Sequence, residues 1–295
     1  MTKCLGCGIE SNSELCDRCF RTKNYNEYIK VDSCLNISDL NIKDKDFLVY
    51  VVDLFDLSNI EFINSLPNNK MLVIAKRDIF PKSLIDNKII FNLKKEYGNF
   101  SDYIFVSSNK NYNLDMFFNK IKNKDKVYFI GNTNSGKSTL INKLIKNYSN
   151  LEFSLTTSNY LNTTLKNIEL KINNLTIVDT PGIYNSKSFF NNLEDFKKII
   201  IKKEIKPKTF QIKEKCSIYI DEYCKIDILS NCNISMYCSN NLDVKKLSYK
   251  ETSDNIINID NNEELVLDNL FILKFSNKCN IIIDNTNIYK RSNIL

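Results

Sequence analysis

Short apolar runs alternate with longer amphipathic stretches through the middle of the chain. Most of the runs are continuous, which is typical of parallel strands that are buried on both faces. They fall at 47–53, 71–75, 103–106, 127–130, 165–172 and 175–178, the last two forming an expected hairpin. Stretches with helical periodicity lie between most of them, at about 81–98, 112–123, 137–147 and 190–204. This alternation predicts an α/β fold with a mostly parallel, doubly wound sheet, whose ligand-binding loops follow the carboxyl ends of the strands.

The pattern changes on both sides of this region. After Pro207, short β-like runs at 216–220, 234–238, 270–275 and 280–283 are separated by turns rich in Asn and Asp, which predicts a β-rich domain. The first 25 residues are polar and short of apolar side chains. We therefore expect three parts: a small module at 1–25, the α/β domain at 26–205 and a β-rich domain at 206–295.

The N-terminal module contains two paired cysteine motifs. Cys4 and Cys7 form one CxxC pair, and Cys16 and Cys19 form the second after a spacer of eight residues. Four thiolates at this spacing suit tetrahedral Zn²⁺. A redox pair or unpaired thiols are the alternatives, and neither explains two matched motifs. Because so short a segment has little apolar core, bound zinc would supply its folding free energy.

A phosphate-binding loop is the strongest chemical signal in the chain. Residues 131–138 read GNTNSGKS, follow a predicted strand and open a predicted helix, as this motif requires. Gly131 and Gly136 allow backbone N–H groups to point at a phosphate. Lys137 would neutralise the β- and γ-phosphates, and Ser138 would bind Mg²⁺. Further nucleotide contacts are expected from Asn134, Ser135 and Thr139.

A second element of the same site follows the last predicted strand of the sheet. Asp179-Thr180-Pro181-Gly182 places a carboxylate at the strand end, where it would hold Mg²⁺ through water. The N–H of Gly182 would contact the γ-phosphate, which makes the next segment a switch. In the loop between the phosphate-binding loop and Asp179, we expect Thr164 to contact Mg²⁺ and the γ-phosphate. The alternative is that this segment is a polar loop without a ligand.

The base-reading candidates precede the phosphate loop. Ala75-Lys76-Arg77-Asp78 is similar to the guanine-reading NKxD pattern, in which the aspartate accepts two hydrogen bonds from guanine and the lysine stem packs along the base. Ser107 and Ser108 follow a strand and fit the loop that meets the guanine carbonyl. Ala75 replaces the usual asparagine, so one polar contact is missing. The order of the motifs indicates a circularly permuted GTPase domain, since re-cutting a core near its termini preserves the sheet.

Composition and charge limit the classes of partner and the chemistry that are possible for this protein. The formal charge of +6 permits a polyanionic partner such as RNA, and the lysine runs near 197–208 and at 245–246 read equally as rRNA contacts or as a solvated face. The chain has ten cysteines and no histidine, so histidine chemistry is excluded. The six cysteines outside the paired motifs are expected to be buried reduced thiols rather than a second metal site. No apolar run reaches membrane-spanning length, and no signal peptide is visible, so we expect a cytoplasmic protein without a membrane partner.

Together these residues resemble the YqeH-type circularly permuted GTPases of ribosome assembly. The resemblance includes the paired cysteines, the phosphate loop and a set of further motifs: Val52-Asp53-Leu54-Phe55-Asp56, Ala75–Asp78 with Pro81-Lys82-Ser83, Thr163-Thr164-Leu165 and Asp179–Gly182. It implies a zinc-finger GTPase that binds GTP, GDP and Mg²⁺ and acts on the small ribosomal subunit or its rRNA. It also implies slow intrinsic hydrolysis, because Ile183 stands where other GTPases keep a water-orienting glutamine. Asn134 matches an asparagine that helps K⁺ sit beside the phosphates in related GTPases.

Two functional hypotheses remain open. The first is a GTP-hydrolysing switch that acts in assembly of the small ribosomal subunit. The second is a nucleotide-binding, RNA- or ribosome-associated scaffold with little turnover, which Ala75 suggests. An ATPase is a more distant third.

Overall fold

The computed structural model describes residues 2–4, 7–17, 19–21, 42–149, 167–183, 185, 188–189, 201–249 and 256–295. The chain divides into two compact units: Met1–Asp78 with Tyr97–Asn185, and Ile79–Glu96 with Ser186–Leu295. Among the described residues, no helix has the length and apolar character needed to cross a membrane. The predicted boundaries near residues 25 and 205 stay a prediction.

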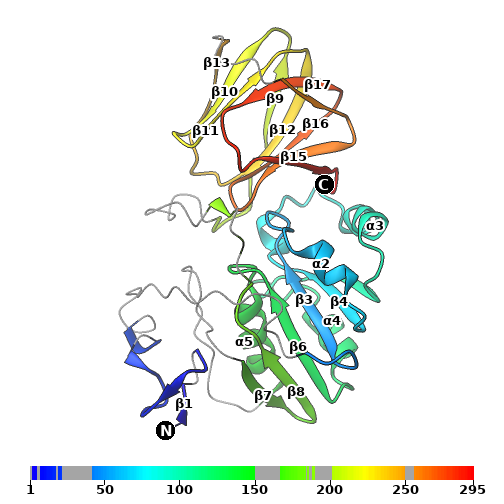
Figure 1. Ribbon diagram of the computed structural model, residues 1–295, viewed down its shortest axis with the longest axis vertical. Helices are drawn as coiled ribbons and strands as arrows, with labels where there is room; N and C mark the ends of the chain where they lie inside the picture. Colours follow the sequence, from blue (N-terminus) through cyan, green and yellow to red (C-terminus); the bar gives the residue numbers. More distant parts are fainter. Residues whose placement is uncertain are drawn as a thin grey trace. The chain divides into compact units, whose positions relative to one another are not determined.

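The first unit contains a six-stranded sheet (Figure 1). Its strands lie in the order β5-β4-β3-β6-β8-β7, and all neighbours are parallel except the hairpin of β7 and β8. The strands are β3 (Phe47–Val52), β4 (Lys70–Ile74), β5 (Asp102–Phe105), β6 (Lys126–Gly131), β7 (Ile168–Ile172) and β8 (Leu175–Asp179). Three parallel strands therefore precede β6, the strand that leads into the phosphate loop. This arrangement confirms the predicted α/β fold and its permuted order.

The helices differ from the prediction mainly at their ends. The structure has α2 (Ile60–Ser65), α3 (Asp86–Glu96), α4 (Leu114–Ile121) and α5 (Lys137–Tyr148). α2 was not predicted, because six residues give less than two turns of periodic pattern. The stretch predicted as helix at 190–204 lies outside the described residues up to 200, and residues 201–204 are not helical. α3 begins at Asp86 rather than at the predicted residue 81, because residues 81–85 form a turn and irregular backbone.

α3 belongs to the second unit. There Asn92 of α3 donates a hydrogen bond from Nδ2 to the carbonyl oxygen of Ile294, at 3.2 Å. The backbone N–H of Ile205 similarly donates to the carbonyl of Ile79, at 2.8 Å. A segment from the middle of the sequence is thus tied to the C-terminal part of the chain.

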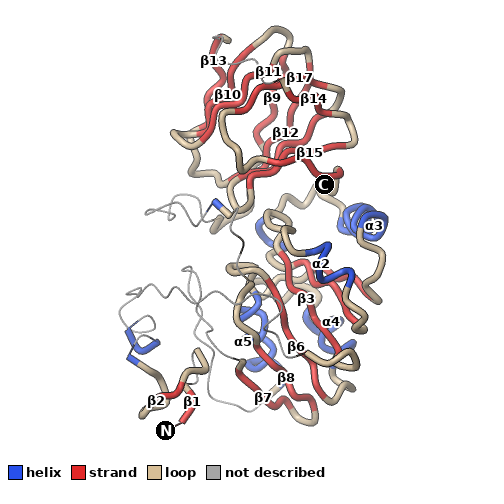
Figure 2. Tube along the Cα trace, in the orientation of Figure 1, coloured by secondary structure: helices blue, strands red, loops and turns tan. Residues whose placement is uncertain are grey.

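The rest of the second unit is built from two antiparallel five-stranded sheets (Figure 2). One has the order β13-β10-β11-β17-β14 and the other β18-β15-β16-β12-β9. Side chains from both sheets, such as Ile218 and Ile281 of the first and Met236 and Leu273 of the second, form one apolar core. The predicted β-rich domain is confirmed. The strands are β9 (Lys208–Ile212), β10 (Cys216–Ile220), β11 (Cys224–Ile228), β12 (Cys232–Cys238), β13 (Val244–Ser248), β14 (Ile257–Ile259), β15 (Glu263–Leu267), β16 (Phe271–Phe275), β17 (Cys279–Ile283) and β18 (Tyr289–Ser292).

The N-terminal module has a minimal backbone framework. Two-residue strands, β1 (Thr2–Lys3) and β2 (Glu10–Ser11), pair antiparallel. Cys4 donates its N–H to the carbonyl of Ile9, and Gly8 donates to the carbonyl of Cys4. Gly8 has φ +78°, a value that glycine adopts without strain. The apolar contacts of this module centre on buried cysteines rather than on aliphatic side chains.

Candidate nucleotide-binding and metal sites

The phosphate loop connects β6 to α5 through two glycines that the geometry requires. Gly136 has φ +95°, in the left-handed region, and immediately precedes α5. A Cβ on Gly131 would lie 2.5 Å from the backbone oxygen of Val51 on the neighbouring strand. Side chains at either position would therefore distort the loop. Asn134 also has positive φ, +65°, which asparagine tolerates better than most residues.

The structure brings the predicted phosphate lysine and magnesium ligands together. Lys137 donates from Nζ to a carboxylate oxygen of Asp179 and, at 2.5 Å, to the carbonyl of Thr180. Both charged side chains are buried, with 5% and 0% of their surface exposed. Ser138 Oγ lies 3.5 Å from the second carboxylate oxygen of Asp179. A hydroxyl and a carboxylate side by side, with an ammonium group next to them, form the donor set that a Mg²⁺–phosphate group needs.

Two further observations fit a bound phosphate chain. The hydroxyl oxygen of Ser135 is buried and has no hydrogen-bond partner among the described residues, so a ligand atom would satisfy it. Gly182 packs closely on the phosphate loop, since a Cβ on it would lie 3.1–3.3 Å from atoms of Thr133. The glycine predicted to contact the γ-phosphate thus lies against the loop that would hold that phosphate. Thr164 lies outside the described residues.

The base-reading residues also converge at the carboxyl edge of the sheet. Asp78 accepts hydrogen bonds from Ser107 Oγ at 2.5 Å and from Asn109 Nδ2 at 3.1 Å, which links the two predicted guanine loops. Lys76 has a left-handed φ of +58° and donates from Nζ to Asp53, at 2.7 Å. This ion pair fixes the position of the Lys76 ammonium group and therefore the path of the aliphatic part of its side chain.

The alanine at position 75 packs against the phosphate loop. Ala75 Cβ lies 3.6 Å from the point that a Cβ on Gly136 would occupy, and the side chain is buried. The lysine stem of the next residue, Lys76, lies at similar distances from that point. An asparagine at position 75 could make a polar contact to the phosphate loop through its amide, whereas Ala75 makes an apolar contact there. The side chain of Lys76 is held by its ion pair with Asp53.

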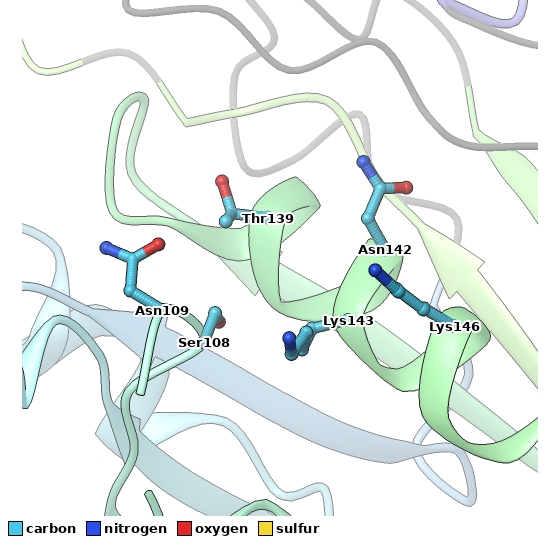
Figure 3. A pocket seen from close by; sticks show the side chains of 6 residues that line it. All are labelled: Ser108, Asn109, Thr139, Asn142, Lys143 and Lys146. Carbon is cyan, nitrogen blue, oxygen red and sulfur yellow. The ribbon is translucent and has the colours of Figure 1, made fainter. Parts of the chain in front are cut away.

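A cavity of about 320 Å³ opens between the second guanine loop and α5 (Figure 3). Ser108 and Asn109 line it from the loop, and polar side chains of α5 line the other side: Thr139, Asn142, Lys143 and Lys146. Of these residues, Ser108 and Thr139 were predicted from the sequence to contact nucleotide, whereas Asn142, Lys143 and Lys146 were not. Their spacing of three and four places them on one helix face, which was the available signal.

The four N-terminal cysteines form one cluster. Their sulfur atoms all lie within 4.8 Å of one another. Among the described residues, this is the one cluster in which three or more Cys, Asp or Glu side chains are close enough to share a metal ion. The Sγ atoms of Cys7 and Cys16 are 3.7 Å apart. A tetrahedron with Zn–S bonds of about 2.3 Å has edges of about 3.8 Å. Cys4 Sγ also accepts the N–H of Cys16, at 3.2 Å, as metal-bound thiolates do. The donor set therefore fits zinc.

The other described cysteines are buried in the second unit. Cys232 and Cys279 lie closest, with their sulfur atoms 3.2 Å apart. The hydrogen bond with Cys232 lowers the pKa of the Cys279 thiol to about 7, although burial acts in the opposite direction and raises it. All five thiols of the β-sheets are free and buried, as predicted. Cys34 lies outside the described residues.

Comparison with known proteins agrees with this geometry. A family model described as "50S ribosome-binding GTPase" matches residues 126–229, beginning at β6. Fold and site together define a circularly permuted P-loop GTPase. The chain is 33% identical over 281 residues to "Uncharacterized protein YqeH" of Bacillus subtilis, covering 80% of this chain and 74% of that protein. The chain therefore belongs to the YqeH family, as its motifs predicted.

Two more distant similarities accompany this match. "Genetic interactor of prohibitins 3, mitochondrial" of Saccharomyces cerevisiae is 33% identical over 94 residues, which are 32% of this chain and 15% of that protein. The crystal structure of YjeQ from Thermotoga maritima has a TM-score of 0.35 and 22% identity, covering 47% of this chain and 48% of that one.

Proposed function

We propose that this protein is a GTP-hydrolysing switch that acts in the cytoplasm in assembly of the small ribosomal subunit. The observation that carries the GTP site is the convergence of the phosphate loop, the strand end at Asp179 and the two guanine loops at one edge of the sheet. The description of the matching family model, "50S ribosome-binding GTPase", supports the link to the ribosome, and the charge of +6 agrees with an RNA-containing partner.

Each site residue has a distinct role in this proposal. Lys137 neutralises the β- and γ-phosphates, and Ser138, Thr164 and Asp179 hold Mg²⁺ directly or through water. Gly182 donates its N–H to the γ-phosphate. Bound Mg²⁺ would offset the charge that develops on the phosphates. Lys137 is paired with Asp179, so the lysine would have to leave this ion pair to contact a phosphate, and the carboxylate would then be available as a metal ligand.

Two further features of the proposal concern rate. Ile183 has an apolar side chain and cannot orient the attacking water, so we expect slow intrinsic hydrolysis. Asn134 lies at the turn of the phosphate loop, and we propose that it supports a K⁺ ion beside the phosphates. Equal GTP turnover in sodium and potassium buffers would contradict the potassium role.

Base specificity depends on Asp78 in this proposal. An asparagine at this position loses one acceptor and gains a donor, so Asp78→Asn is expected to lower GTP affinity about a hundredfold and to favour a base with a carbonyl at C2. Competition of GTP, XTP and ATP against a fluorescent guanine nucleotide measures the change. An unchanged GTP preference would place the base elsewhere, and a wild-type preference for ATP would favour the ATPase hypothesis.

Co-sedimentation tests the ribosomal partner. The wild-type protein is incubated with purified small or large subunits in GTP, GDP or no nucleotide. We expect binding to the small subunit that depends on nucleotide, with several-fold more protein in one nucleotide state than in another. Because the matching family model names the 50S particle in its description, the large subunit is the essential second arm. Binding to the large subunit alone, or binding that ignores nucleotide, would contradict the proposal.

The same preparation separates the two functional hypotheses. A switch enzyme hydrolyses GTP faster when small subunits are added. The scaffold hypothesis, which Ala75 in the base-reading motif favours, instead gives nucleotide-dependent binding with no added turnover.

A further inference from the structure

One buried carboxylate near the nucleotide site has no role in the proposal above. Asp56 lies just beyond β3, in a tight turn in which its N–H donates to the carbonyl of Asp53 at 2.9 Å. Only 3% of its surface is exposed. An ionised carboxylate at this depth requires several hydrogen-bond donors, because burial without them is strongly unfavourable. The identity of those donors indicates what the residue does.

Ser58, two residues further on, donates to Asp56 Oδ1 from its Oγ at 2.7 Å and from its N–H at 3.2 Å. Two more donors come from distant parts of the chain, and the first belongs to the phosphate loop. Asn132, the second residue of that loop, donates from Nδ2 to Asp56 Oδ1 at 2.8 Å. The amide oxygen of Asn132 accepts from Asn59 Nδ2 at 2.7 Å. Asn132 is itself buried. The buried amide of this phosphate-loop residue is thus held by several polar side chains, of which Asp56 is the carboxylate.

The second donor belongs to the segment after Gly182. Asn185 donates from Nδ2 to the same oxygen, Asp56 Oδ1, at 3.2 Å. Ile183, which lies between Gly182 and Asn185 in the sequence, pairs with the phosphate loop. Its N–H donates to the carbonyl of Gly131, and its carbonyl accepts from the N–H of Thr133. The start of the proposed switch therefore runs along the phosphate loop and ends at a carboxylate that both share.

We propose that Asp56 is a positioning residue that couples the phosphate loop to the switch segment and thereby favours GTP over GDP. The inference rests on the proposed GTP site. Asn185, held by Asp56, keeps Gly182 against Thr133 before nucleotide arrives, so its N–H is in place for a γ-phosphate. GDP has no γ-phosphate and gains nothing from this arrangement. A residue with a purely structural role would instead affect both nucleotides equally.

Equilibrium binding of fluorescent GTP and GDP analogues to the full-length protein tests the coupling. For Asn185→Ala we expect GTP affinity to fall about tenfold, the usual effect of losing a hydrogen bond to a charged group, while GDP affinity changes less than about twofold. Asp56→Asn keeps the size of the side chain but removes its charge and replaces one carboxylate oxygen with a donor NH₂ group, and it should lower the GTP-to-GDP preference at least as much. Thermal unfolding of each variant is recorded alongside.

A matched control and the wild type make the outcomes distinct. Asn269→Ala removes a buried amide from the other compact unit, where Asn269 donates to Ser188 Oγ at 3.0 Å, and should leave the GTP-to-GDP preference unchanged. Equal weakening of both nucleotides by Asn185→Ala, or no weakening of either, would overturn the coupling. If the wild type binds neither nucleotide, the proposed function itself is wrong.

Discussion

Replacing Lys137 with alanine is expected to weaken GTP binding about a hundredfold and to abolish GTP turnover. The ammonium group is the buried positive charge that contacts both Asp179 and the carbonyl of Thr180. Without it, the β- and γ-phosphates face the Asp179 carboxylate with no compensating side-chain charge from this position. Binding is measured with a fluorescent GTP analogue, and turnover is measured as phosphate release in Mg²⁺ and K⁺.

The same substitution has a second expected effect, on stability. Asp179 is fully buried, and removing its cation leaves an uncompensated charge that costs about 3–5 kcal/mol. Thermal unfolding therefore accompanies each binding measurement, and binding is determined well below the transition. Excess Mg²⁺ should restore part of the lost stability, because the metal replaces the ammonium group beside Asp179.

Lys126→Ala is the control for loss of a lysine near the loop. Lys126 begins the strand that leads into the phosphate loop, but its ion pair with Glu169 is solvent-exposed and contributes little to stability. We expect GTP affinity and unfolding temperature close to those of the wild type. If Lys137→Ala and Lys126→Ala had the same GTP affinity, the phosphate site would not be where the loop places it.

The sequence contained most of the fold because the fold depends on local pattern. Buried parallel strands produce continuous apolar runs, which located five strands of the sheet, while β7 alternates apolar and polar residues and was located as the partner of β8 in a hairpin. The phosphate loop was equally visible, since Gly136 must adopt a positive φ and few sequences satisfy the motif. In the second unit β10, β12, β16 and β17 were located as short apolar runs, whereas other strands, such as β14 with three residues, carry too little pattern to be seen.

Contacts between residues that are distant in the chain could not be predicted from the sequence. Asp56 is visible in the sequence only as the end of the Val52–Asp56 motif, because nothing local shows that Asn132 and Asn185 both donate to it. The ion pair between Lys76 and Asp53 was hidden for the same reason. Such contacts depend on which strands are neighbours, and strand order follows from the whole sheet rather than from any one segment.

We propose that the four N-terminal cysteines bind zinc, and removing that zinc is expected to unfold the N-terminal module while the β-rich unit stays folded. The module has two strands of two residues each and a core made of cysteine side chains, so its apolar burial cannot offset the entropy of ordering the chain. Structural zinc in such modules contributes about 10–16 kcal/mol of apparent binding free energy. A strong chelator should release about one zinc ion per chain, which a colorimetric zinc assay measures. Limited proteolysis should then cut within the first 21 residues.

Cysteine substitutions show whether the metal is bound by this cluster. Cys4→Ser removes a ligand whose sulfur also accepts the N–H of Cys16, and we expect purified protein that lacks zinc and is cut at the N-terminus without chelator. Cys224→Ser replaces a buried thiol in β11, outside the cluster, and should retain its zinc. Equal zinc content in the two variants, or a metal-free chain whose N-terminus still resists protease, would show that thiol packing alone holds the module together. The chain has no histidine, so no imidazole can replace a lost cysteine ligand. We therefore expect Cys4→Ser to lose all of its zinc rather than part of it.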